Sequence, residues 1–126
     1  MTESKFTVWF CKQLKNIGAI TLTFVGGNVK QQSSLPDRYI CHSKFRGWVE
    51  FKAEKGKLMM GQKLMLKALD DRGDTAVVCR WRKTKNDILI EDYNGNLLDS
   101  LSLNDVSMRN AGIKLLNLLI SGTDFY

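Results

Sequence analysis

The stretch Leu35–Gln62, LPDRYICHSKFRGWVEFKAEKGKLMMGQ, holds most of the residues in this chain that can carry chemistry. Asp37 directly follows the only proline of the sequence, and Glu50 and Lys52 flank one phenylalanine in a Glu-Phe-Lys unit. Hydrolysis of a phosphodiester with a bound metal ion needs acids, a positioned cation and a group that orients them. This stretch supplies all three within one predicted hairpin and one turn of helix.

The predicted hairpin brings the two acids near each other. Residues 38–42 and 47–52 have the composition of strands, and the four residues between them suit a turn. Side-chain alternation puts Glu50 and Lys52 on one face of the second strand. Pairing the facing ends of the strands puts Asp37 opposite Lys52 and makes Glu50 its diagonal neighbour, at roughly 7–8 Å between backbones. Two carboxylates at that separation can share one divalent ion.

These residue types suit a magnesium site. Mg²⁺ prefers oxygen ligands and keeps several waters, so two acids and a substrate phosphate suffice to hold it. Asp37 and Glu50 fit the ligand role, and the backbone carbonyl of Phe51 can add a further ligand. Lys52 can position the attacking water or neutralise developing charge. The alternative is an exposed hairpin whose cross-strand ion pairs contribute little to stability.

Two polar residues fall on the apolar sides of predicted helices next to this hairpin. An amphipathic helix is predicted over residues 3–17, with Thr2 as its N-cap and Glu3 on its apolar stripe. Another is predicted over residues 58–69, with Gln62 on the apolar side. Glu3 either supports the site or complements the positive end of its helix. Gln62 either orients a site group, since a buried amide needs a hydrogen bond, or lies half exposed at the helix margin.

The rest of the chain predicts a mixed sheet with helices against it. Residues 75–81 form a predicted strand, and the helix before them favours a β-helix-β crossover with parallel pairing. The final helix, 104–120, has Val106 and Ile113 on its apolar side and is apolar over most of its circumference. It is therefore either deeply buried or part of a subunit contact. Further strands are predicted at 19–25, at 87–91 and in the return segment after Asn94-Gly95.

Length and composition predict one intracellular domain. The 126 residues, 44% of them hydrophobic, suffice for one core and are too few for two. The three cysteines are far apart and match no disulfide or zinc pattern, so we expect free thiols in a reducing compartment. We expect neither a signal peptide nor a membrane span. The net charge of +6 suits a polyanionic partner such as nucleic acid, or simply promotes solubility.

The motifs of the hairpin resemble a known nuclease signature. Pro36-Asp37 followed by Glu50-Phe51-Lys52 is similar to the signature of the PD-(D/E)XK nuclease superfamily. The run from Gly56 to Gln62, with the helix and strand after it, resembles the VRR-NUC branch of that superfamily. Phage and archaeal Holliday-junction resolvases of the same superfamily are similar in size and layout. The resemblance covers about residues 1–82, and the segment after Arg82 matches nothing in the family.

The resemblance implies both a fold and a set of residue roles. The fold is α/β, with a restriction-endonuclease-like core in which a mixed β-sheet is flanked by helices, within a single domain. Asp37 and Glu50 match the ligands of Mg²⁺ or Mn²⁺, and Lys52 matches the catalytic lysine. Gln62 matches the glutamine of the family's helix, and Glu3 is the best match for the acid of its first helix, which adds a metal ligand.

The expected activity is metal-dependent hydrolysis of DNA, with a preference for branched DNA such as a Holliday junction. The alternatives are a nicking or flap nuclease in recombination, repair or DNA degradation, and a DNA-binding protein of the same fold without catalysis. Small members of the superfamily often act as homodimers, and residues 87–120, an addition to the family core, offer a contact for one. A phage-encoded origin in a bacterial host stays open. The basic run Arg80–Lys85 either contacts nucleic acid or ends a solvated strand. Phosphate contacts are expected from Arg38, Lys44, Arg46, Lys55, Lys57 and Lys63.

Overall fold

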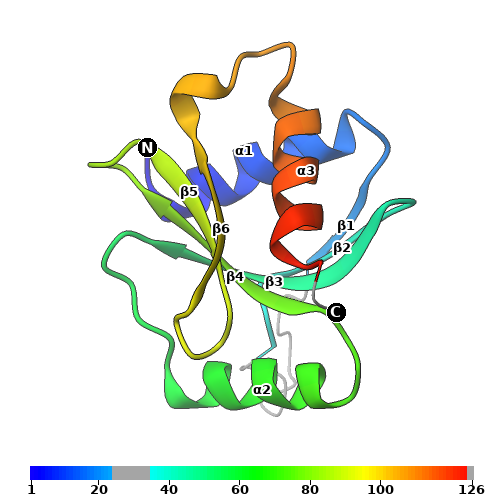
Figure 1. The fold of residues 1–126 in the computed structure, drawn as a ribbon, viewed down its shortest axis with the longest axis vertical. Helices are drawn as coiled ribbons and strands as arrows, with labels where there is room; N and C mark the ends of the chain where they lie inside the picture. Colours follow the sequence, from blue (N-terminus) through cyan, green and yellow to red (C-terminus); the bar gives the residue numbers. More distant parts are fainter. Residues whose placement is uncertain (24–34, 125–126) are drawn as a thin grey trace.

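The computed structural model describes residues 1–23 and 35–124. They form one mixed sheet of six strands in sequential order with helices packed against it (Figure 1). The strands are β1 (Ile20–Thr23), β2 (Arg38–His42), β3 (Phe45–Ala53), β4 (Ala76–Arg82), β5 (Asp87–Glu91) and β6 (Leu97–Ser102). The helices are α1 (Glu3–Lys15), α2 (Met60–Asp71) and α3 (Ala111–Gly122), with a 3-10 turn at Leu103–Asp105. The predicted α/β fold with a mixed sheet is confirmed.

Strands β3 and β4 pair in parallel, and the other neighbouring pairs are antiparallel. Helix α2 connects β3 to β4, so the predicted crossover and its parallel pairing are confirmed. A parallel pair of this kind is normally covered on both faces. In agreement, the first four residues of β4, Ala76 to Cys79, are all buried.

Helices cover both faces of the sheet, and each face has its own apolar core. Helices α1 and α3 lie on one face, where Phe10, Phe51 and Leu115 are completely buried. Helix α2 lies on the other face and packs Leu66 against Val78. Figure 1 shows this arrangement, with α1 and α3 above the sheet and α2 below it. Since side chains alternate along β3, the residues on either side of Phe51 face α2.

Helix α1 forms largely as predicted. The Thr2 hydroxyl oxygen accepts a hydrogen bond from the Lys5 N–H at 3.2 Å, which confirms the N-cap. The helix ends at Lys15, two residues earlier than predicted, and Gly18 follows with a φ of +97°. Glycine adopts this left-handed conformation without the steric cost of a side chain. The apolar stripe is completely buried at Phe6, Phe10 and Leu14.

Helix α3 begins later than predicted. Before it, the Ser107 N–H donates to Asn110 Oδ1 at 2.7 Å, and the Asn110 N–H donates to the Ser107 hydroxyl at 3.3 Å. Such local bonds compete with helix formation. Val106 therefore precedes the helix, and Ile113 is 52% exposed, so their placement on its apolar side was wrong. The broad apolar surface of α3 lies in the domain's own core, where its four leucines are buried: Leu115, Leu116, Leu118 and Leu119.

The segment after Arg82 packs into the same sheet and the same apolar core as the rest of the domain. Strand β5 pairs with β4, and Ile88 and Ile90 lie in the same core as Phe6. Helix α3 approaches α1 closely at Gly112, where an added Cβ would lie 2.7 Å from the Gln13 carbonyl oxygen. These contacts join the C-terminal hairpin and helix to the core formed by α1 and β3.

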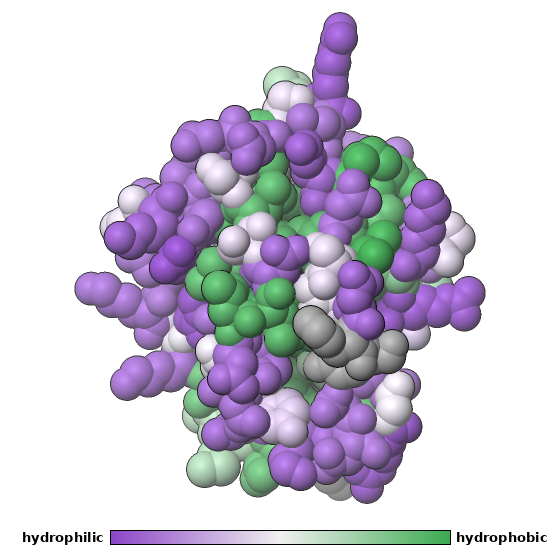
Figure 2. Space-filling model, viewed as in Figure 1, coloured by the Kyte–Doolittle hydropathy of each residue, from purple (hydrophilic) through white to green (hydrophobic). Residues whose placement is uncertain are grey.

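Two predictions at the N-terminal side concern residues that the structure describes only in part. The strand predicted at 19–25 corresponds to β1, and its last two residues lie outside the described residues. Residues 28–34, a polar stretch whose composition predicts a loop, lie outside them as well. Among the described segments, no helix has the length and apolarity needed to cross a membrane. Figure 2 shows hydrophilic side chains over most of one face, interrupted by smaller apolar patches.

Candidate active site

The hairpin of β2 and β3 sets the position of the two central acids. Arg38 pairs with Val49, so the preceding residue, Asp37, lies across from Glu50. The predicted pairing of Asp37 with Lys52 is wrong by two residues. The reason is the turn, which is shorter than predicted because β3 already begins at Phe45. A shift of two residues keeps every side chain on its predicted face and brings the acids closer together.

Asp37 and Glu50 are joined by their own backbone and side-chain groups. The Asp37 N–H donates to Glu50 Oε1 at 3.2 Å. The Asp37 carboxylate, through Oδ2, accepts from the N–H of Phe51 at 2.9 Å. The predicted juxtaposition of the two acids is thus present, and both carboxylates are oriented by backbone donors.

Glu3 occupies the next position along the same edge of β3. Its Oε2 accepts from the N–H of Ala53 at 3.0 Å. Since the N–H and C=O of one strand residue point to the same edge, the Phe51 carbonyl lies between the Asp37 and Glu3 carboxylates. The two N–H groups that they bind are two residues apart, about 6.6 Å along the strand. A hollow of about 190 Å³ is lined by Glu3 and Asp37, together with Thr7, Val8 and Arg38.

Glu50 is a buried acid with a strongly shifted pKa. Its side chain is 4% exposed. Burial, and secondly the negative charge of Asp37, raise the pKa of the Glu50 carboxyl from 4.5 to about 8, although Lys52 acts in the opposite direction. Buried acids with a like-charged neighbour are common at functional sites, where a cation or a proton relieves the repulsion.

Lys52 and Gln62 complete the surroundings of Glu50. The Lys52 ammonium nitrogen lies 3.9 Å from Glu50 Oε2, and its side chain is 13% exposed. The Gln62 side-chain amide donates to the same oxygen at 3.1 Å. Its own carbonyl oxygen accepts from the Met59 N–H at 2.9 Å, so Gln62 also caps α2. The prediction that Gln62 orients a nearby group is therefore consistent with its contacts.

The residues predicted to hold Mg²⁺ have the donor atoms that the ion requires. Glu50 Oε1 and Oε2 each accept one hydrogen bond and retain a further lone pair. Asp37 Oδ1 accepts no hydrogen bond within the described part of the chain, and the Phe51 carbonyl is directed toward the same edge. All of these are hard oxygen donors, so they fit Mg²⁺ or Mn²⁺. Across residues 1–23 and 35–124, no three His, Cys, Asp or Glu side chains are grouped closely enough to form a metal cluster.

The predicted DNA-binding residues fall into two groups. Lys44 and Arg46 are exposed at the far end of the hairpin, about 20 Å along β3 from Lys52. The others lie near the acids, on β2, in the β3–α2 connection and at the start of α2: Arg38, Lys55, Lys57 and Lys63. Only this second group is positioned to contact a substrate at the acid pair.

Arg80 has a role that the sequence did not reveal. Its guanidinium donates to Glu91 Oε1 at 2.9 Å and to the carbonyls of Ala53 and Gly56 at 2.9 and 2.5 Å. It thereby holds the turn between β3 and α2. Arg82 forms a bidentate pair with Asp87 at 2.8 and 2.6 Å. Both arginines of the basic run therefore bind groups within the domain. Their acidic partners, Glu91 and Asp87, lie on β5 and are set by the pairing of β5 with β4.

The histidine and the cysteines have structural roles. His42 accepts from the Lys44 N–H through Nδ1 at 3.1 Å, so Nε2 carries the proton and donates to the Ile17 carbonyl at 3.0 Å. All three cysteines are free, as predicted, and burial raises the pKa of the Cys11 and Cys79 thiols. None of these groups reaches the acid pair through a hydrogen bond.

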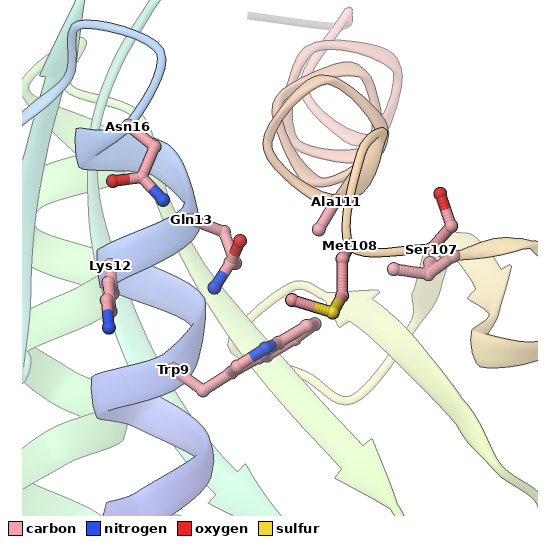
Figure 3. Close-up of a pocket in the computed structure, with 8 residues that line it drawn as sticks. Trp9, Lys12, Gln13, Asn16, Ser107, Met108 and Ala111 are labelled. Atoms are coloured by element: carbon pink, nitrogen blue, oxygen red, sulfur yellow. The ribbon is translucent and has the colours of Figure 1, made fainter.

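A separate hollow of about 490 Å³ lies on the opposite face of the sheet. Figure 3 shows the side chains of Trp9, from α1, and Met108, from the segment before α3, pointing toward one another in its lining, with Lys12, Gln13 and Asn16 along α1. No acid lines it, so it is distinct from the site at the end of β3.

Comparison with protein-family models and with curated proteins finds no match for this chain. Its function therefore has to be inferred from the residues and their geometry.

Proposed function

We propose that this protein is a divalent-metal-dependent DNA endonuclease that acts on branched DNA. The observation that carries the proposal is the pair of adjacent acids, Asp37 and Glu50, with the Lys52 ammonium 3.9 Å from one of them. A buried acid beside a second, part-buried acid destabilises a domain unless the pair binds a cation or a proton. The resemblance of the motif to the nuclease signature, and the mixed sheet with helices on both faces, support the same interpretation.

Each side chain of the site has a defined task in this proposal. Asp37, Glu50 and the Phe51 carbonyl would hold Mg²⁺. Glu3 is not grouped closely enough with the two acids to share the ion directly in this structure, and it would support them from the same edge of β3. The bound ion supplies charge neutralisation at the phosphoryl oxygens and activates a water. Lys52 holds that water or stabilises the developing negative charge. Gln62 fixes the Glu50 carboxylate so that its second lone pairs stay directed at the site.

The preference for branched DNA follows from what the domain contains. The whole described chain forms one sheet and its helices, without a separate sequence-reading module. Paired incision of a junction requires two copies of a single site, so we propose a homodimer as the acting unit. The four leucines of α3 are buried in the domain's own core, so a contact through this helix would use its outer face around Ile113.

Cleavage assays on a panel of junction, flap, nicked and linear DNAs test the proposal. With Mg²⁺ or Mn²⁺, the wild type should cut, and Asp37→Asn and Glu50→Gln should each lose at least about a hundredfold in rate. Asp71→Asn, at an exposed acid at the far end of α2, serves as the charge-matched control and should cut normally.

Four results would contradict parts of the proposal. If the wild type cuts nothing with either ion, or if the acid variants cut as well as the control, the enzymatic assignment fails. If linear duplex is cut as fast as the junction, the preference for branched DNA fails. Preferred cutting of the flap or nicked DNA would identify the alternative nuclease class.

A further inference from the structure

A second hollow lies beside the acid pair, on the same face of the sheet. Its volume is about 400 Å³. Three parts of the chain meet around it: the β3–α2 connection with the start of α2, the middle of β4, and the turn between β5 and β6. The residues that matter here are Lys57, Lys63, Val78, Arg80 and Tyr93. Figure 1 shows the β5–β6 turn extending past the sheet toward α2.

The strand register places this hollow next to the site. Glu50 pairs with Val78, and Lys52 pairs with Arg80, in the parallel ladder of β3 and β4. Paired residues point to the same face, and neighbouring strands are about 4.8 Å apart. The floor of the hollow is therefore one strand away from the acid and lysine of the site. Lys63, at its wall, directly follows Gln62, which contacts Glu50.

The net charge of the residues that line this hollow is positive. Glu91 is paired with Arg80 at 2.9 Å. Asp92 accepts from the N–H groups of Asn94 and Asn96 at 2.8 and 2.9 Å, which orient its carboxylate but do not neutralise it. With Lys57, Lys63 and Arg80 against Glu91 and Asp92, the lining carries a net charge of +1. The two lysines, by contrast, form no ion pair with any residue in the described ranges. A phosphate is the anion that two lysines beside a phosphodiesterase site would bind.

Tyr93 adds an aromatic surface to the same hollow. It is partly buried and packs against the core of Leu66 and Val78, which fixes the position of its ring. The hydrogen bonds of Asp92 hold the turn that carries it. Sites for single-stranded nucleic acid combine cationic groups for the backbone with aromatic rings on which bases stack.

We propose that this hollow binds one unpaired nucleotide of the substrate strand, adjacent to the scissile phosphate. Lys57 and Lys63 bind its phosphate, and Tyr93 stacks on its base. The inference rests on the proposed nuclease function and extends it, because it identifies an unpaired nucleotide as the feature of branched DNA that is recognised. It also gives the β5–β6 turn, which lies outside the motif-bearing part of the chain, a role in substrate binding.

Binding measurements without cleavage test this proposal. Fluorescence anisotropy in EDTA compares a single-stranded oligothymidylate, the same oligomer with abasic sites, and a fully paired duplex. The double variant Lys57→Gln/Lys63→Gln should lower the slope of log affinity against log salt for oligothymidylate by up to about 1.4, since each lysine–phosphate contact with a single strand contributes about 0.7. The matched control, Lys12→Gln/Lys15→Gln on the opposite face, should leave this slope unchanged.

Tyr93 is tested with variants that differ only in stacking. Tyr93→Leu should weaken oligothymidylate binding about tenfold, since base stacking on an aromatic ring contributes about 1–3 kcal/mol. It should not change binding of the abasic oligomer or of the duplex, and Tyr93→Phe should bind like the wild type. A thermal melt of each variant verifies that it is folded.

The possible results separate the two proposals. If the two double variants change the salt slope equally, or if Tyr93→Leu binds oligothymidylate like the wild type, the nucleotide site is wrong while the nuclease function stands. If the wild type binds none of the DNAs and also fails the cleavage assay, both proposals are wrong.

Discussion

The Gln62 side-chain amide donates a hydrogen bond of 3.1 Å to the Glu50 carboxylate, and so links the start of α2 to the buried acid of β3. The same side chain accepts from the Met59 N–H at 2.9 Å. One glutamine therefore both caps the helix and orients the acid. Its position in the first turn of α2 makes the helix start and the site geometry depend on each other.

Replacing Gln62 should therefore affect more than helix capping. Gln62→Leu leaves Glu50 Oε2 without this donor and the Met59 N–H without its acceptor. We expect a loss of about 1–3 kcal/mol in the free energy of unfolding, measured by urea denaturation. Gln62→Glu keeps an acceptor for the Met59 N–H but places a carboxylate next to Glu50, which already lies beside Asp37. We expect this variant to be destabilised by the repulsion between the acids. If both variants are as stable as the wild type, Gln62 contributes nothing to the site.

The raised pKa of Glu50 predicts that the metal-free protein loses stability as the pH rises. Below about pH 4.5 the folded and unfolded chains both hold the proton on Glu50, so this group adds no cost. Between 4.5 and about 8 the unfolded chain has released the proton while the folded chain still binds it. Stability should then fall by on the order of 5 kcal/mol over this window, at about 1.4 kcal/mol per pH unit, and not further above it.

Urea denaturation in EDTA at a series of pH values measures this effect. Glu50→Gln cannot release the proton, so its stability should vary much less between pH 5 and 8. Asp71→Asn, the exposed control, should follow the wild type. An equal pH dependence in wild type and Glu50→Gln would show that Glu50 is not the titrating group.

The same acid pair predicts stabilisation by divalent ions. Mg²⁺ or Mn²⁺ binds only the folded site, so it should raise the melting temperature, and the rise should grow with the logarithm of ion concentration once the site is saturated. Asp37→Asn should abolish the shift, because one of the two adjacent carboxylates is lost. Differential scanning calorimetry measures it, and a shift that persists unchanged in Asp37→Asn would place the ion elsewhere.

Arg80 should be among the residues whose loss costs most stability. Its partner Glu91 is only 13% exposed, and removal of one member of a buried pair typically costs about 3–5 kcal/mol. Arg80→Gln also releases the Ala53 and Gly56 carbonyls that position the β3–α2 turn. The exposed pair of Lys67 and Asp71, at 2.8 Å, gives the control. Lys67→Gln should cost less than about 1 kcal/mol.

The sequence predicts the face of β3 on which each side chain lies better than it predicts the residues that each one contacts. Alternation has a period of two, so Glu50 and Lys52 fall on one face whatever the register. The partner of Asp37 depends on the turn length, which composition alone does not determine, and the predicted register was wrong by two residues. The contacts of Arg80 depend on pairing between β4 and β5. The hydrogen bonds between Ser107 and Asn110 make α3 begin later than predicted, and the spacing of apolar residues gives no sign of such bonds.

Lys52 should separate catalysis from metal binding. Its ammonium lies 3.9 Å from Glu50 Oε2, close enough to act on a water or phosphoryl oxygen at the site, but it offers no lone pair to a cation. Lys52→Met keeps most of the side-chain volume and removes the charge. We expect cleavage to fall by about 10²–10³, while the Mg²⁺-induced shift in melting temperature persists.

Because Lys52 lowers the pKa of Glu50, its loss should also raise that pKa further and weaken ion binding near neutral pH. Lys12→Met, on the opposite face, is the control and should change neither property. Normal cleavage by Lys52→Met would remove the lysine from the mechanism, and loss of the thermal shift at pH 9 would indicate a structural role instead.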